Sequence, residues 1–167
     1  MRGKRAGIYG SLIGMTCLIA AFLMWLAVTE PLQSTGLDTV EHREEGYTEY
    51  VIGLENAGVG AIELLSVTVN GTEAPDLAQL GISYDSAHLV QVMPEPEPAI
   101  RFMELNAAPI NPKLTPEQMR EALELKFNTP ISYGLRLRLD EAPITRVTVR
   151  YRYLGFSKTA VITRWFP

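Results

Sequence analysis

Residues 135–153 have the sequence LRLRLDEAPITRVTVRYRY, in which apolar and polar side chains alternate in two successive runs. The first run, 135–139, alternates leucine with arginine. The second run, 147–153, alternates valine or tyrosine with threonine or arginine. A period of two is typical of a β-strand that buries one face. The segment Asp140-Glu141-Ala142-Pro143 between the runs has the composition of a turn. We therefore predict two strands that are joined as a hairpin.

The register of this hairpin places several arginine side chains together on the face opposite the apolar one. They are Arg136, Arg138, Arg146, Arg150 and Arg152. Like charges that lie opposite one another in a sheet are destabilising unless they are neutralised. One hypothesis is neutralisation within the domain, by Glu63 or by Glu104 and Glu124. The other is an anionic partner, such as lipid headgroups, an envelope polymer or an acidic protein face.

Further segments with a period of two predict more strands on either side of this stretch. They are Tyr47–Leu54, Ala61–Asn70 and Lys158–Trp165, and two shorter apolar runs are Leu89–Val92 and Ile100–Leu105. The dipeptide Asn70-Gly71 is a strong signal for a tight turn. Seven to nine short strands separated by turns are typical of an all-β domain, and we predict an antiparallel β-sandwich.

One segment predicts a helix within this β-rich region. Thr115-Pro116-Glu117-Gln118 has the residues of a capping box, with a proline suited to the first turn. Residues 123–127 then alternate apolar and charged side chains. We therefore expect a helix of one to two turns that gives way to a strand near Leu123. Alternate prolines at positions 94, 96 and 98 predict an extended loop or edge.

The N-terminal segment Ile8–Val28 is apolar and contains no charged residue. As a helix it extends over roughly 31 Å, the thickness of a bilayer's hydrocarbon core. Basic residues precede it and Glu30 follows it, so the positive-inside rule places the N-terminus in the cytoplasm. We predict a cytoplasmic N-terminus (1–7), a transmembrane helix (8–28), a juxtamembrane linker (29–45) and an extracytoplasmic β-sandwich domain (46–167).

Two alternatives to an uncleaved anchor remain open. One alternative is a signal peptide cleaved near Ala27-Val28-Thr29, and the other is acylation of Cys17, the one cysteine of the chain. A cleaved signal normally has a shorter apolar region.

Three glycines of the helix, Gly7, Gly10 and Gly14, lie at a spacing that lets two helix backbones approach closely. This spacing predicts a helix-mediated dimer; the alternative is that the glycines only reflect how common glycine is in membrane-spanning helices.

The stretch Tyr50–Asn70, with Leu54-Glu55-Asn56-Ala57-Gly58, resembles the early strand pair of immunoglobulin-like or fibronectin-type domains. The segment Tyr151–Gly155 before a final strand resembles their late strand pair. The cysteine pair and the core tryptophan of antibody domains are absent. With its N-terminal anchor, the chain is similar to small, uncharacterised single-pass envelope proteins of Gram-positive bacteria. That resemblance implies an immunoglobulin-like fold and a location, and no activity.

The sequence offers no set of residues typical of a catalytic or metal site. Ser86 and His88 are too close in the chain to form a relay, which normally draws on separate elements. His88 with Met93, Met103 and Met119 is the best set for a soft metal, but methionines are common core residues. The exterior domain also lacks the cysteine motif of the copper-delivery assembly factors, whose topology is similar. We therefore predict no catalytic residue, no metal and no cofactor.

These observations predict a membrane-anchored, extracytoplasmic binding or assembly module of the cell envelope that is not an enzyme. Its expected partners are the bilayer and a protein or an anionic envelope polymer. A net charge of −4 argues against nucleic acid as a partner. The alternative is a metal-handling or accessory factor for a membrane complex.

Overall fold

The computed structural model describes residues 2–71, 73–92, 97–140 and 143–165, with side chains of the first helix described from Gly14 onward. The chain forms two compact units, Met1–Glu30 and Pro31–Pro167. The first unit is a single helix, α1 (Arg2–Val28). Its described part exposes apolar side chains such as Leu18, Met24 and Val28.

The predicted membrane span, 8–28, lies entirely within α1. Residues 8–13 of that span fall outside the described side chains, as do Gly7 and Gly10. In the part of the chain that the structure describes, no helix combines the length and the hydropathy needed to cross a membrane. Gly14 has open space around its Cα.

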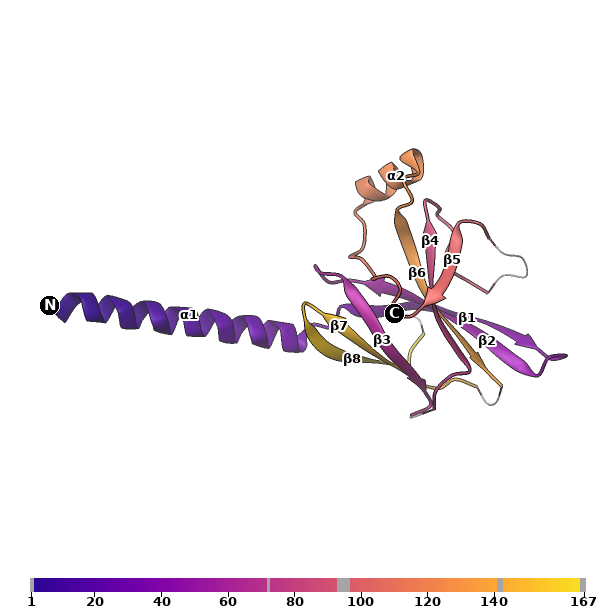
Figure 1. Ribbon diagram of the computed structural model, residues 1–167, viewed down its shortest axis with the longest axis horizontal. Helices are drawn as coiled ribbons and strands as arrows, with labels where there is room; N and C mark the ends of the chain where they lie inside the picture. The colour runs from indigo at the N-terminus through magenta and orange to yellow at the C-terminus, as the bar shows by residue number, and fades with distance from the viewer. Residues whose placement is uncertain (1, 72, 93–96, 141–142, 166–167) are drawn as a thin grey trace. The chain divides into compact units, whose positions relative to one another are not determined.

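The second unit is mostly β (Figure 1). Its described residues form eight strands: β1 (Leu32–His42), β2 (Tyr47–Asn56), β3 (Ile62–Val69), β4 (Leu77–Tyr84), β5 (Ile100–Glu104), β6 (Pro130–Leu139), β7 (Val147–Tyr153) and β8 (Phe156–Ile162). They make two antiparallel sheets, sheet A in the order β1-β2-β6-β4-β5 and sheet B in the order β3-β7-β8. This arrangement is consistent with the predicted sandwich.

The core is formed by alternate residues of both sheets, because successive side chains of a strand point to opposite faces. Sheet A contributes a row of fully buried side chains at one register position: Ile52, Leu135 and Leu80. Sheet B contributes its own buried residues: Ile62, Leu64, Val69, Val147, Val149, Tyr151 and Tyr153. We call the side of each sheet that points away from this core its outer face.

Several predicted elements are confirmed, with boundaries moved by one to three residues. The predicted strands 47–54 and 61–70 are β2 and β3, and Asn70 and Gly71 both have the positive φ of a tight turn. The strand predicted at 158–165 is β8, displaced toward the N-terminus.

The predicted start of the second helix is also confirmed. In α2 (Pro116–Leu125) the Thr115 hydroxyl accepts the Gln118 N–H, and the Gln118 side chain accepts the Thr115 N–H. The predicted end near Leu123 is wrong. The helix continues to Leu125 and closes on Lys126 in the left-handed conformation, and the next strand begins at Pro130. Its i to i−4 hydrogen bonds outweigh the local alternation of residues 123–127.

The predicted linker over 29–45 is wrong, since most of it is the strand β1. Its residues are polar because β1 is an edge strand, half-exposed along most of its length. Pairing with β2 holds it in place, from Leu32 opposite Asn56 to His42 opposite Tyr47. The predicted domain start at residue 46 is corrected accordingly to Pro31.

The predicted hairpin between 135–139 and 147–153 is also wrong. β6 pairs with β2 and β4 in sheet A, whereas β7 pairs with β3 and β8 in sheet B. The segment between them therefore passes from one sheet to the other. Alternation along each strand is the same in either arrangement, so the pattern predicted both strands correctly without identifying their neighbours.

Candidate binding pocket

A row of glycines crosses the outer face of sheet A. Gly36 lies opposite Gly53, Gly53 opposite Gly134, and Gly134 opposite Gly81, so four neighbouring strands lack a side chain at the same level. Glycine within a strand often marks a place where another group approaches the backbone closely. The row forms a trough, which we call the glycine trough.

One half of the glycine trough is filled by Val90, from the loop that follows β4. A Cβ added to Gly134 would lie 2.8 Å from the Val90 Cβ, and one added to Gly81 would lie 2.6 Å from its Cγ1. Val90 is only 5% exposed as a result. Methyl groups at either glycine would displace this side chain.

The loop is held down on both sides of Val90. The Val92 N–H donates to Asp38 Oδ2 of β1 at 2.8 Å, and the Ser132 hydroxyl of β6 donates to the His88 carbonyl at 3.1 Å. At the base of the loop, the Asp85 carboxylate accepts the N–H groups of Asn128 and Thr129. The loop, residues 85–92, is therefore held at a defined position across sheet A, and we call it the strap.

The other half, over Gly36 and Gly53, borders a pocket of about 470 Å³, and the Thr35 side chain covers Gly53 there, since an added Cβ would clash with the Thr35 Oγ1. This volume lies within the range of small-molecule sites. Gly36 and Gly53 belong to its lining, together with mostly apolar residues from β1, β2, β6, the strap, α2 and the segment before α2. The apolar lining residues are Leu37, Val51, Leu54, Ala87, Leu89, Val90, Pro112, Leu114, Met119, Pro130 and Ile131.

The charged groups that line the pocket are paired within the protein. Lys113 Nζ lies 2.8 Å from Glu55 Oε2, and the Asp38 carboxylate accepts N–H groups from Val92 and from its own neighbour Thr39. The Lys113 and Glu55 side chains are 62% and 28% exposed, so their ion pair is screened by solvent and contributes at most about 1 kcal/mol. The pocket therefore presents an apolar surface without a free charge among its described residues.

Tyr133 and Asn111 close the pocket where β6 begins. The Tyr133 hydroxyl accepts the Asn111 N–H at 3.1 Å. Burial raises the pKa of the Tyr133 phenol above its ordinary value, and the hydrogen bonds from Asn111 offset part of that rise. The ring therefore remains a neutral phenol, which adds no charge to the pocket.

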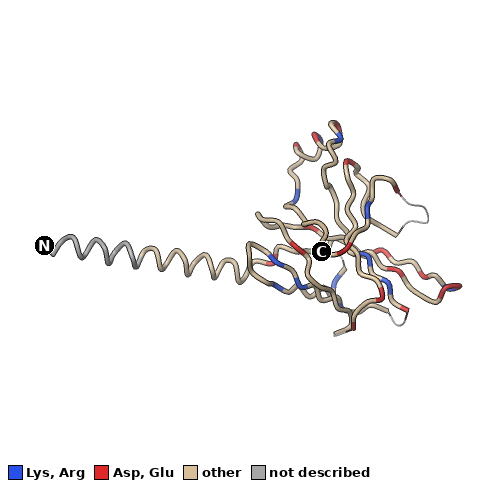
Figure 2. Tube along the Cα trace, in the orientation of Figure 1, with Lys and Arg blue, Asp and Glu red and all other residues tan. Residues whose placement is uncertain are grey.

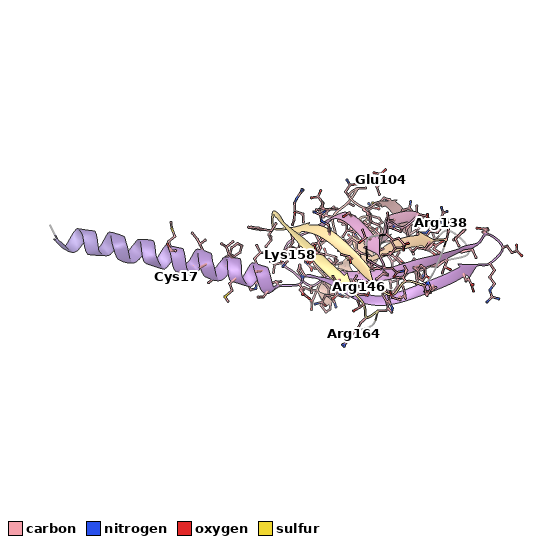
Figure 3. The ribbon with its side chains drawn as sticks, turned by 90° about the horizontal axis from the view of Figure 1, so that it is seen from below. Cys17, Glu104, Arg138, Arg146, Lys158 and Arg164 are labelled. Atoms are coloured by element: carbon pink, nitrogen blue, oxygen red, sulfur yellow. The ribbon has the colours of Figure 1, made fainter. Side chains whose placement is uncertain are left out.

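The five predicted arginines do not form one stripe. Arg136 and Arg138 lie on the outer face of sheet A, and Arg150 and Arg152 lie on that of sheet B. Figure 2 shows basic residues spread over both sheets, and Figure 3 shows Arg138 and Arg146 apart from one another.

On sheet A the two arginines are held by neighbouring side chains. Arg136 makes a bidentate ion pair with Glu49, at 2.6 and 3.0 Å, and its guanidinium lies 4.8 Å from the centre of the Phe102 ring. The Glu49 side chain is only 8% exposed. Arg138 lies over the Tyr47 ring at 5.1 Å. These contacts occupy Arg136 in particular and leave it little capacity for an outside anion.

On sheet B the arginines are exposed. Arg152 pairs with Glu63 at 2.7 Å, which confirms one of the predicted internal partners. Of the other two, Glu124 pairs with Arg120 instead. Arg146 and Arg150 are exposed and form no ion pair within the described ranges. An anionic partner at these two positions remains a prediction.

The residues considered for a metal site are dispersed. His88 Nδ1 lies 3.6 Å from Glu97 Oε2, Met119 lines the pocket and Met103 belongs to β5, while Met93 lies outside the described residues. Among the residues that the structure describes, no group of three or more His, Cys, Asp or Glu side chains is placed to hold a metal ion.

Sequence reasoning missed the pocket, although the chain carries a signal for it. Each glycine of the trough sits inside a strand and is followed by an aliphatic residue: Gly36-Leu37, Gly53-Leu54, Gly81-Ile82 and Gly134-Leu135. The aliphatic partners Leu54, Ile82 and Leu135 are buried, so the glycine before each of them lies on the outer face. Four such pairs in four strands indicate a level of the sheet that side chains from other segments can cover, as Val90, Phe102 and Thr35 cover it here.

Comparison with known proteins adds no family to this description. The chain matched no protein-family model, no curated protein and no solved structure. The geometry of the pocket and the sequence are therefore the basis of the function proposed next.

Proposed function

We propose that this protein is a membrane-anchored, extracytoplasmic binding module of the cell envelope, without enzymatic activity, and that the pocket over Gly36 and Gly53 is its ligand site. The observation that carries the proposal is the pocket of about 470 Å³ with apolar walls and internally paired charges. A concave, mostly apolar pocket with few polar groups is the usual form of a small-ligand site.

We further infer that the domain is an immunoglobulin-like sandwich with one added strand. In such domains strands A, B, E and D form one sheet and strands C, F and G the other. The order β1-β2-β6-β4 matches the first sheet and β3-β7-β8 matches the second, with β5 added at the edge beyond β4. In this fold the ligand site lies on the outer face of the A-B-E-D sheet.

The anchor is supported by the sequence of the first helix. Residues 8–28 are apolar without a charged residue, and three basic residues precede them. The exposed Leu18, Leu23 and Met24 side chains lie on different sides of the described part of α1, as their spacing at 3.6 residues per turn requires. Apolar residues all around a helix are typical of a segment surrounded by other apolar groups.

Protease treatment of intact cells tests the location. We expect a C-terminally tagged chain to stay in the membrane fraction after an alkaline wash and to lose its tag to protease added outside. A tag that is protected in intact cells, or a full-length chain recovered free in solution, contradicts the proposed location.

Photolabelling tests the ligand site. Benzophenone is a small apolar probe that reacts on illumination, and mass spectrometry locates its adducts in the full chain held in lipid nanodiscs. We expect adducts on the pocket residues Leu89, Leu114 and Met119. Ala87→Trp, at an exposed position of the lining, should fill the pocket and remove them, whereas Thr159→Trp, at an exposed position of sheet B, should not. Equal labelling of both variants contradicts a ligand site here.

A further inference from the structure

We propose that the pocket takes one hydrocarbon chain of a membrane lipid. This inference rests on the proposed function and specifies its ligand. The first support is the way the protein fills the other half of the same trough. Val90, a branched aliphatic side chain, lies directly on Gly81 and Gly134 with no polar contact from its side chain in the described structure. Beyond Val90 the pocket continues over Gly36 and Gly53, where the Thr35 side chain lies on Gly53 and the apolar residues Val51 and Leu89 belong to the lining.

The second support is the charge state of the lining. Lys113 and Glu55 neutralise each other, Asp38 is used by the strap, and the Ser132 hydroxyl donates to the His88 carbonyl. The Asn56 side chain, also at the lining, makes hydrogen bonds to Gly58, Gly60 and Ile110. A ligand with charged groups would compete with these contacts, whereas a hydrocarbon chain would not; two further polar side chains of the lining, Thr35 and Gln91, are exposed.

The third support is size. A cavity of about 150 Å³ accepts benzene, which has six carbon atoms. By the same proportion, a pocket of about 470 Å³ accommodates on the order of eighteen carbons, the length of a common acyl chain. Apolar residues at the open side extend the contact. Leu89 is 63% exposed and belongs to the lining, so a bound chain would cover a side chain that is otherwise in water.

The fourth support is the supply of lipid chains next to a membrane-anchored domain. A domain tethered by the proposed anchor stays beside a bilayer, where lipid chains have a very high local concentration. A weak site is occupied under such conditions, because tethering replaces a search through solution. A chain taken from the bilayer exchanges one apolar environment for another and leaves its headgroup in water.

The experiment uses two photoreactive probes in nanodiscs that hold the full chain. One is phosphatidylcholine with a diazirine in one acyl chain, and the other is the free fatty acid with the same diazirine. We expect the lipid probe to form adducts on Leu89, Leu114 or Met119. Leu89→Ser should reduce the adducts on Leu114 and Met119 roughly tenfold, since it removes an aliphatic contact that the bound chain would cover. Val161→Ser is the matched control, because Val161 is similarly exposed (57%) but lies on sheet B; it should leave them unchanged.

The outcomes separate this inference from the proposed function. If only the free fatty acid labels the pocket, a membrane lipid is not the source and the inference is overturned. If benzophenone labels the pocket and neither chain probe does, the pocket is a ligand site for another apolar group, and the hydrocarbon chain is excluded. If none of the three probes labels it, the inference and the ligand site fail together.

Discussion

The outer faces of the two sheets carry the same pair of residue types and use them differently. On sheet A, Glu49 and Arg136 form a pair in which the carboxylate is buried, and a strap covers the neighbouring glycines. On sheet B, Glu63 and Arg152 form a pair whose side chains are 43% and 51% exposed. The difference teaches that an alternating strand does not determine the role of its outward side chains. The neighbouring side chains do, as Phe102 and Tyr47 do against Arg136 and Arg138 on sheet A.

The largest expected effect comes from removing the buried carboxylate. Glu49→Gln leaves the Arg136 guanidinium without its charged partner in a largely covered site, and we expect a loss of about 3 kcal/mol in the free energy of unfolding. Glu63→Gln is the matched change on sheet B, where an exposed pair contributes at most about 1 kcal/mol. Chemical denaturation of both variants measures the contrast. Equal losses would show that the two faces do not differ in the way described.

The glycine trough provides the second test. Gly134→Ala places a methyl group 2.8 Å from Val90 and 3.0 Å from Val51. Overpacking of this kind should cost about 1–3 kcal/mol and displace the strap. Hydrogen exchange at the Val92 N–H, which donates to Asp38, reports the displacement directly. Ser157→Ala, on the open face of sheet B, should change stability by less than about 0.5 kcal/mol. An unaltered Val92 exchange rate in the Gly134 variant would mean that the strap does not need the trough.

The smallest effect on stability is expected at the exposed arginines of sheet B. Arg146→Gln with Arg150→Gln should leave the free energy of unfolding within about 0.5 kcal/mol of its original value. If this face binds an anionic surface, the double variant should attach to vesicles rich in phosphatidylglycerol more weakly, by about 1 kcal/mol for each arginine. Light scattering of proteoliposomes mixed with such vesicles measures attachment. Unchanged attachment removes the anionic-partner hypothesis for these two residues.

Local chemistry made much of the β-domain predictable. The capping box at Thr115 and Gln118 and the turn at Asn70-Gly71 depend on hydrogen bonds and backbone angles within four residues, and both are present. The strands with clear alternation, such as β2 and β7, bury one face, and the alternation of apolar and polar residues in the sequence shows which face it is. The edge strand β1 was not predictable in this way, because a strand exposed over most of its length lacks the apolar period.

The candidate site was not predictable from any one segment. Its floor comes from β1 and β2, its walls come from the strap and from Met119 of α2, and its charges are paired between Lys113 and Glu55. These segments are far apart in the chain, and only the sheet order brings them together. The prediction that the five arginines share one face was wrong for the same reason. The assumed neighbour of β6 was β7, and the real ones are β2 and β4.

The sequence by itself determined the strands with clear alternation, such as β2, β3 and β7, the residues of those strands that face inward and the start of α2, because these properties depend on period and on short-range hydrogen bonding. Only the tertiary structure decided that β6 and β7 belong to different sheets, that Glu49 is the partner of Arg136 and that four glycines share one register. The physical reason is that the edge of a strand can pair with many other strands, and its outer face can pack against many side chains. The packing of the whole domain decides which of these partners is used.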